Sequence, residues 1–165
     1  MALLKYLFVY FTVLLAVSKA RRTEINVLEQ HGVVIKKVDI TKCKVDGNPG
    51  NDTVIERCGI IRGSETRISI YLQAIDLKGK NTEKITFSVC GYFFFCIPMS
   101  VEEDDFCKSG SKCPLKDNKK ILQKLTMSLP INQHYPKMKV TSKVTMKYGD
   151  GSTLGAFEVK LRIVD

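Results

Sequence analysis

Apolar and polar residues alternate with a period of two in four stretches of this chain, the pattern of β-strands that bury one face. From position 68 to 74 the even-numbered residues are apolar, and from position 85 to 89 the odd-numbered ones are. Residues 138–146 and 157–163 repeat the pattern on either side of a turn at Tyr148–Ser152. Only Ile121–Leu129 fits a helical face as well as a strand. The chain is therefore predicted to be all-β, an antiparallel β-sandwich of six to eight short strands.

The N-terminal segment has the features of a secretory signal peptide. Residues 1–20 contain an early lysine, Lys5, then an apolar run from Tyr6 to Val17 and small residues before position 21. Residues 21–165 are then predicted to form one exported domain, in the extracellular space or in the lumen of lysosomes or endosomes. Loss of Lys5 and Lys19 with the signal lowers the formal charge from +9 to +7. That excess suits attraction to anionic surfaces, and equally the solvated surface of an ordinary secreted domain.

Every cysteine lies after the signal, and an even number in an oxidising compartment predicts disulfides, although many pairings are open. The six are Cys43, Cys58, Cys90, Cys96, Cys107 and Cys113. A bridge between Cys43 and Cys58 would close a turn-rich loop that holds the sequon Asn51-Asp52-Thr53, so Asn51 is a predicted glycosylation site. In a straight strand Cys90 and Cys96 would lie roughly 20 Å apart, too far for a disulfide. Either the chain folds back between them, or they stay free or pair elsewhere.

No arrangement typical of an enzyme, a metal site or a cofactor site occurs in the sequence. The acidic run Glu102–Asp105 is typical of a solvated turn, and His134 has no nucleophile motif beside it. There is no CxxC pair, and only His31 and His134 could supply imidazole, so neither a metal nor a cofactor is predicted. The lysine-rich face of residues 137–147 lacks interleaved aromatic residues, which argues against nucleic-acid binding.

The segment Cys107–Pro114, CKSGSKCP, closely resembles the ML-domain lipid-recognition family, which includes the Niemann-Pick type C sterol carrier and the group 2 mite allergens. Leu129-Pro130-Ile131 and Tyr135-Pro136 match that family's elements at the same mutual spacing, and Val34–Val38 and Cys58–Leu72 match in pattern and length. The resemblance implies an immunoglobulin-like β-sandwich whose two sheets hold a sterol, a fatty acid or another small lipid, with no catalysis. It also implies that Cys107 and Cys113 form a structural clip.

Carried over position by position, the resemblance places a lipid pocket between the sheets. Its rim falls on Pro130, Ile131 and Tyr135, with Met99 at the entrance. The matching wall positions are Ile40, Ile68, Val89, Phe93 and Phe157. Strand parity independently turns Ile70, Phe93 and Phe95 toward the same interior. Tyr92 and Phe94 then face outward, where an aromatic pair suits transient contact with a membrane, a receptor or a second copy.

The chain departs from the family in two respects that concern the fold, one of which is that Cys90 and Cys96 are additional cysteines. The disulfide that usually joins the first and last strands is missing, because those positions read His31-Gly32 and Gly155–Phe157. The sandwich is therefore expected to open more easily. Three functions fit the sequence: a secreted lipid carrier, a sensor that presents an anionic glycolipid to a receptor, and an interaction module with a filled core. The identity of the lipid and the oligomeric state are left open.

Overall fold

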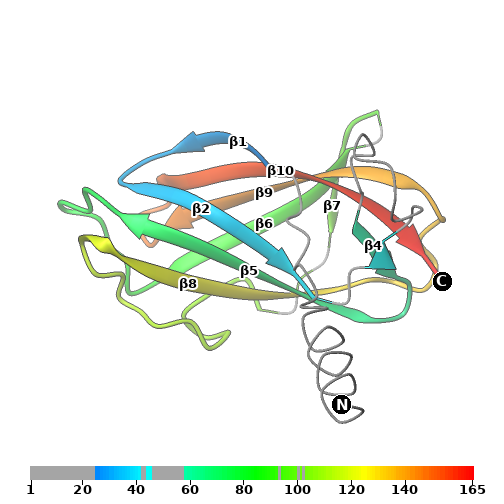
Figure 1. Ribbon diagram of the computed structural model, residues 1–165, viewed down its shortest axis with the longest axis horizontal. Coiled ribbons are helices and arrows are strands. Elements are labelled where there is room, and N and C mark those ends of the chain that lie inside the picture. Colours follow the sequence, from blue (N-terminus) through cyan, green and yellow to red (C-terminus); the bar gives the residue numbers. More distant parts are fainter. Residues whose placement is uncertain (1–24, 42–43, 46–57, 93, 100, 102) are drawn as a thin grey trace, which may run out of the picture.

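The computed structural model describes residues 25–41, 44–45, 58–92, 94–99, 101 and 103–165, and these form an all-β sandwich (Figure 1). The predicted antiparallel, immunoglobulin-like fold class is confirmed. The strands are β1 (Ile25–Gln30), β2 (Val33–Ile40), β3 (Lys44–Val45), β4 (Cys58–Ile61), β5 (Glu65–Ala74), β6 (Ile85–Tyr92), β7 (Cys96–Met99), β8 (Asn118–Pro130), β9 (Lys139–Tyr148) and β10 (Thr153–Val164). No helix within these described ranges is long and apolar enough to cross a membrane.

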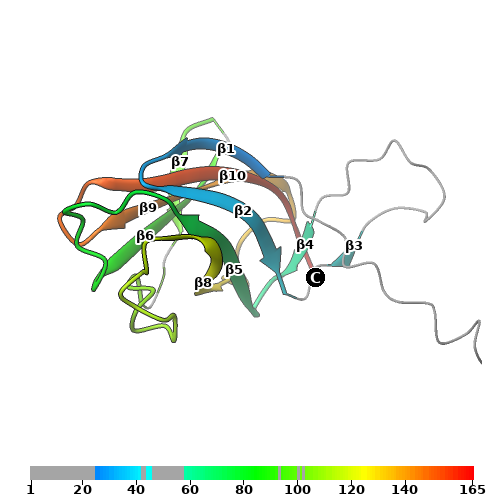
Figure 2. The same cartoon turned by 60° about the vertical axis from the view of Figure 1, so that its left-hand side comes forward.

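Two sheets face each other across the core (Figure 2). The large sheet has seven strands in the order β3-β4-β10-β9-β6-β7, with β1 also paired to β10. The small sheet has three strands in the order β2-β5-β8. All pairings are antiparallel except that of β4 with β10. There are more strands than the six to eight expected because β3, β4 and β7 are too short to show a period in the sequence.

The core lies between the inner rows of the two sheets, and the predicted alternation supplies those rows. Ile68, Ile70 and Leu72 of β5 are buried opposite the large sheet, whose inner rows contain Val144 and Phe157. Each such side chain contributes about 1.5–3 kcal/mol when fully buried. The ambiguous segment Ile121–Leu129 is part of strand β8. Pairing with β5 settles its conformation, and the inner positions from Leu125 onward are buried.

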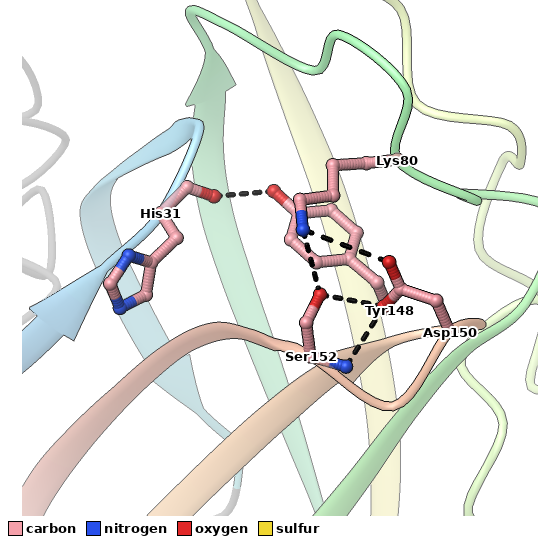
Figure 3. A network of polar contacts seen from close by, with 5 residues as sticks. All are labelled: His31, Lys80, Tyr148, Asp150 and Ser152. Carbon is pink, nitrogen blue, oxygen red and sulfur yellow. Dashed lines mark hydrogen bonds and ion pairs between the residues drawn. The ribbon is translucent and has the colours of Figure 1, made fainter.

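The turn between β1 and β2 carries the chain from the large sheet to the small one, and Tyr148 fastens it (Figure 3). The hydroxyl of Tyr148 donates a hydrogen bond to the backbone carbonyl of His31. Gly32 follows at a φ of +74°, and its carbonyl accepts hydrogen bonds from the amides at positions 75 and 76, directly after β5 of the small sheet. The expected disulfide between the first and last strands is missing, and backbone contacts join this region instead. Gln30 pairs with Gly155, and the amide of His31 donates to the carbonyl of Leu154.

Two disulfides lie wholly within the described residues. Cys107 and Cys113 are bonded with their Cα atoms 5.5 Å apart. Cys90 and Cys96 are bonded with their Cα atoms 5.4 Å apart, because the chain folds back after Tyr92 so that β7 pairs with β6. Cys58 is disulfide-bonded as well. Its expected partner Cys43, the expected glycosylation site Asn51 and the expected signal at 1–20 lie outside the described residues.

Candidate functional site

The inner row of β6 ends at a glycine, and a hollow begins there. Ile85, Phe87 and Val89 point into the core and are buried, and the next inward position is Gly91. With no side chain at Gly91, the space in front of the strand is open and forms a cavity of about 350 Å³. We call it the apolar cavity; its lining residues are Gly91, Ile97, Met99, Tyr135, Pro136, Met138, Val140 and Ile163. Such a lining accommodates an apolar molecule and offers few polar contacts to orient it.

Several elements build the walls of the apolar cavity. The β6–β7 hairpin supplies one side, and the inner faces of β9 and β10 supply the floor through Val140 and Ile163. The loop between β8 and β9, which contains Tyr135 and Met138, closes the other side. Space at the floor is limited, since a Cβ atom at Gly91 would lie 3.0 Å from Cγ2 of Val140. A side chain at position 91 would therefore press against Val140 at the floor of the apolar cavity.

The β8–β9 loop is held against the large sheet by polar contacts. The amide of Ile163 donates to the carbonyl of Met138 at 2.8 Å, and Nη1 of Arg62 donates to the carbonyl of Tyr135 at 3.4 Å. Lys137 and Arg62 both form ion pairs with Asp165. These two cations, Lys137 foremost, hold the pKa of the Asp165 carboxyl below its usual range. The carboxylate thus stays charged across the physiological pH range and keeps the loop in place.

A second and larger hollow is polar. This polar cleft, of about 810 Å³, lies between the start of β5, the end of β8 and the Cys107–Cys113 clip with the segment that precedes it. Its lining residues are Gly63, Ser64, Glu65, Glu103, Lys108, Ser109, Ser128, Pro130, Ile131, Asn132 and Gln133. Two carboxylates and one ammonium group make its lining net negative, which disfavours an anionic ligand. Its polar walls also make it the poorer site for the body of a lipid.

The structure brings two of the predicted site residues to the apolar cavity, Met99 and Tyr135. Pro130 and Ile131 line the polar cleft instead. The predicted wall residues Ile68, Ile70, Val89 and Phe157 are at most 3% exposed in the packed core, and Ile40 packs against that core from its edge. These five residues do not line either hollow.

The expected inward orientation of Phe95 is wrong, because its side chain is 67% exposed. The expectation assumes that the strand of β6 continues through position 95, so that alternate side chains keep facing inward. The chain instead reverses between β6 and β7, and the alternation does not continue across a turn. The expectation that Tyr92 and Phe94 face outward agrees with their exposure. Phe93 lies outside the described residues.

Sequence reasoning did not single out six of the residues that line the apolar cavity: Gly91, Ile97, Pro136, Met138, Val140 and Ile163. Parity did place Met138, Val140 and Ile163 on inward faces, but it does not separate core from cavity. The available signal was Gly91, a glycine that ends a row of large inward side chains. Among the described residues there is no group of three or more His, Cys, Asp or Glu side chains that could hold a metal ion.

Comparison with known proteins gives concordant results. A family model described as the ML domain matches residues 29–163. A mouse (Mus musculus) protein named NPC intracellular cholesterol transporter 2 is 24% identical over 131 residues, which cover 79% of this chain and 77% of the mouse protein. A crystal structure of a Niemann-Pick type C2 protein from the Japanese carpenter ant superposes with a TM-score of 0.65 at 16% identity, covering 86% of this chain and 99% of the ant chain. At that identity the structural match shows a shared fold.

Proposed function

This chain belongs to the ML-domain family of lipid-binding proteins, and we propose that it is a secreted carrier that holds a sterol, a fatty acid or a similar small lipid in the apolar cavity. Lipid binding in general follows from the family. The carrier role is supported by the mouse relative, which is named a cholesterol transporter. The disulfides of this chain suit the oxidising compartments through which such a carrier would be exported.

The observation that carries the proposal is the hollow in front of Gly91. A filled core would continue the inner row of β6 with another large side chain, whereas this row stops at a glycine and leaves about 350 Å³ lined by apolar groups. Ligand pockets typically have about 300–1,000 Å³. Transfer of a lipid's apolar surface from water into this lining would contribute roughly 25 cal/mol per Å² buried. The polar end of the lipid would stay at the open mouth, where water solvates it.

The two alternatives have weaker support. A sensor of anionic glycolipid needs cations around a polar headgroup, and the polar cleft offers Lys108 against Glu65 and Glu103. An interaction module with a filled core is favoured by the tight packing around Ile70 and Phe157, but it does not explain why the apolar cavity is present. The carrier hypothesis accounts for both the packed centre and the hollow end.

Identification of bound lipid tests the proposal directly. The protein would be purified from a eukaryotic secretory host without detergent, extracted with organic solvent and analysed by mass spectrometry, alongside uptake of labelled sterol and labelled fatty acid from water. We expect a stoichiometric lipid in the extract, or saturable uptake by the delipidated protein. A protein that emerges free of lipid and takes up neither probe is not a carrier.

Two features of the precursor belong to the same proposal. Residues 1–20 are removed on export to leave a single lipid-binding domain at 21–165, and Asn51 carries a glycan. The intact mass of the secreted protein should correspond to a chain that begins at Arg21. Treatment with an N-glycosidase should lower that mass further, and Asn51→Gln should abolish the glycosidase shift. A secreted chain that retains residues 1–20, or a glycosidase shift that survives Asn51→Gln, would contradict this processing.

A further inference from the structure

The turn of the β6–β7 hairpin exposes a group of large apolar side chains. Tyr92 is 39% exposed, Phe94 87%, Phe95 67% and Ile97 46%. No charged residue occurs anywhere from Ile85 to Val101, so nothing in this stretch opposes transfer into an apolar medium. We call these four side chains the hairpin tip. An apolar group of this kind on the surface of a protein marks a contact site.

The hairpin tip projects from the body of the sandwich and is braced at its base. In both views the turn that follows β6 extends beyond the neighbouring strands of the large sheet (Figures 1 and 2). Cys90 and Cys96 are disulfide-bonded just below the tip, and Tyr92 pairs with Cys96 across the hairpin. Because the disulfide restrains the backbone of both strands, docking of the tip requires less ordering of the backbone than it would in an open hairpin.

Cations lie beside the tip on the outer face of the large sheet. The register places Tyr92 in one row with Thr141 of β9 and Lys160 of β10. One adjacent row on this face contains Cys90, Lys143 and Glu158. The adjacent row on the other side contains Lys139 and Arg162. Four cations against one carboxylate therefore stand behind an uncharged aromatic tip. This arrangement is typical of proteins that insert aromatic residues at a bilayer surface while cations contact anionic headgroups.

The hairpin that exposes the tip also forms a wall of the apolar cavity, through Gly91, Ile97 and Met99. We propose that the hairpin tip is a membrane-docking element, which inserts into the surface of an anionic lipid bilayer and brings the apolar cavity to the membrane. The proposal rests on the carrier function, since docking places the cavity where lipid enters or leaves. The partner of the hairpin tip is a bilayer, because an uncharged tip can enter the apolar layer while Lys139, Lys143 and Lys160 stay at the level of the headgroups.

Vesicle binding by matched variants tests the docking. The mature protein would be floated with vesicles of phosphatidylcholine alone and of equal parts phosphatidylcholine and phosphatidylglycerol. We expect binding to the anionic vesicles, and a loss of about tenfold or more in the double variant Phe94→Ser/Phe95→Ser. The control is Ile121→Ser/Leu122→Ser, which removes apolar side chains of 45% and 50% exposure from β8 and should bind like wild type. Equal effects of the two double variants, or no binding by wild type, would overturn the proposal.

The cationic rows are tested separately. Lys139→Glu/Lys143→Glu should weaken binding to the anionic vesicles by about tenfold or more. The same charge reversal at Lys119 and Lys120, at the start of β8, serves as the control and should have little effect. If both pairs weaken binding equally, the attraction comes from net charge and the outer face of the large sheet has no special role.

Insertion itself can be measured because the chain contains no tryptophan. Phe94→Trp introduces a single fluorophore at the tip, and Leu122→Trp introduces one at the control site. On anionic vesicles the first should shift its emission to shorter wavelength and be quenched by brominated phosphatidylcholine, and the second should not. Equal quenching of both variants would contradict insertion through the hairpin tip.

Failure of docking and failure of the carrier function have different signatures. Uptake of labelled fatty acid from water, with no vesicles present, should be the same for wild type and Phe94→Ser/Phe95→Ser. Transfer of the same lipid between vesicles should slow about tenfold in that variant only. A wild-type protein that takes up no lipid from water refutes the carrier, whereas uptake without tip-dependent transfer refutes only the docking.

Discussion

The phenol of Tyr148 is 1% exposed and donates its hydrogen bond to the backbone carbonyl of His31, 117 residues earlier in the chain. Tyr148 ends β9 of the large sheet, and His31 lies in the turn that leads into the small sheet. The ring also lies 5.4 Å from the ammonium group of Lys80, which contacts Ser152 and Asp150 (Figure 3). The disulfide that the family resemblance leads one to expect between the first and last strands is missing, since positions 31–32 and 155–157 contain no cysteine. Here a hydrogen bond and backbone pairing join the same region.

Removal of that hydroxyl should destabilise the fold modestly. Tyr148→Phe keeps the ring but leaves the carbonyl of His31 without this donor, so the free energy of unfolding should fall by about 1 kcal/mol. Urea denaturation followed by circular dichroism measures the change. Tyr92→Phe, at an exposed tyrosine, is the control and should leave stability unaltered. An unchanged midpoint for Tyr148→Phe would show that the bond does not contribute.

The same phenol predicts a loss of stability in alkali. Burial first, and then the carboxylates of Asp150 and Asp76, raise the pKa of Tyr148 from 10.0 to about 12. Below pH 10 the phenol is neutral in both states and its contribution is fully present. Between pH 10 and 12 the unfolded chain gives up its proton while the folded chain keeps it, so stability falls. The difference in the free energy of unfolding between wild type and Tyr148→Phe should shrink between pH 10 and 12. A constant difference would contradict the raised pKa of Tyr148.

Gly32 should tolerate no side chain. Its φ is +74°, and a Cβ atom there would lie 2.3 Å from the carbonyl oxygen of Asp76. Gly79 has a φ of +70° but no heavy atom within 4 Å of the same position, so it isolates the backbone term. Gly79→Ala should lower the free energy of unfolding by about 1 kcal/mol, and Gly32→Ala should lower it by about 2 kcal/mol more. Thermal denaturation of the two variants makes the comparison, and equal losses would mean that the crowding at Gly32 relaxes freely.

Filling the apolar cavity should lower lipid affinity without unfolding the protein. Gly91→Val places branched methyl groups in the hollow, where even a Cβ atom lies 3.0 Å from Val140. Affinity for a labelled sterol or fatty acid should fall about tenfold. Met127→Leu, in the packed core away from the cavity, is the control and should bind as wild type does. Undiminished binding by a folded Gly91→Val protein would place the lipid elsewhere.

Ser142 offers a test of the core. It is 1% exposed on the inner face of β9, and its hydroxyl has no hydrogen-bond partner within the described part of the chain. A buried hydroxyl without a partner costs about 1–3 kcal/mol. Ser142→Ala should therefore raise the unfolding free energy by about 1 kcal/mol. Ser88→Ala, at an exposed position of β6, should change nothing, and a loss of stability in Ser142→Ala would reveal a partner for that hydroxyl.

The strands and their buried faces were predictable because their alternation is local. Ile68, Ile70 and Phe157 were placed inside from parity alone, and they are buried. Parity failed at Phe95 because the chain reverses between β6 and β7, and only the spacing of Cys90 and Cys96 indicated a reversal.

The site was harder to predict than the fold. Inward apolar residues such as Ile68 and Val140 look alike in sequence, yet the first packs in the core and the second lines the apolar cavity. What separates them is the missing side chain at Gly91, on a different strand. The polar cleft could not be predicted, because Glu65, Lys108 and Ser128 come from three separate segments that share no pattern.

The two ends of the sandwich are fastened by different chemistry. At one end Tyr148 forms a buried, uncharged hydrogen bond with the β1–β2 turn. At the other, the loop beside the apolar cavity is fastened by Arg62 and Lys137 to Asp165, in ion pairs that reach solvent. Dissolved salt screens exposed charges over about 8 Å at physiological ionic strength but leaves a buried neutral bond unaffected. Higher salt should therefore weaken the ion pairs that hold the loop at the cavity, and also the exposed Lys80–Asp150 pair beside Tyr148, while the buried hydrogen bond from Tyr148 to His31 keeps its strength.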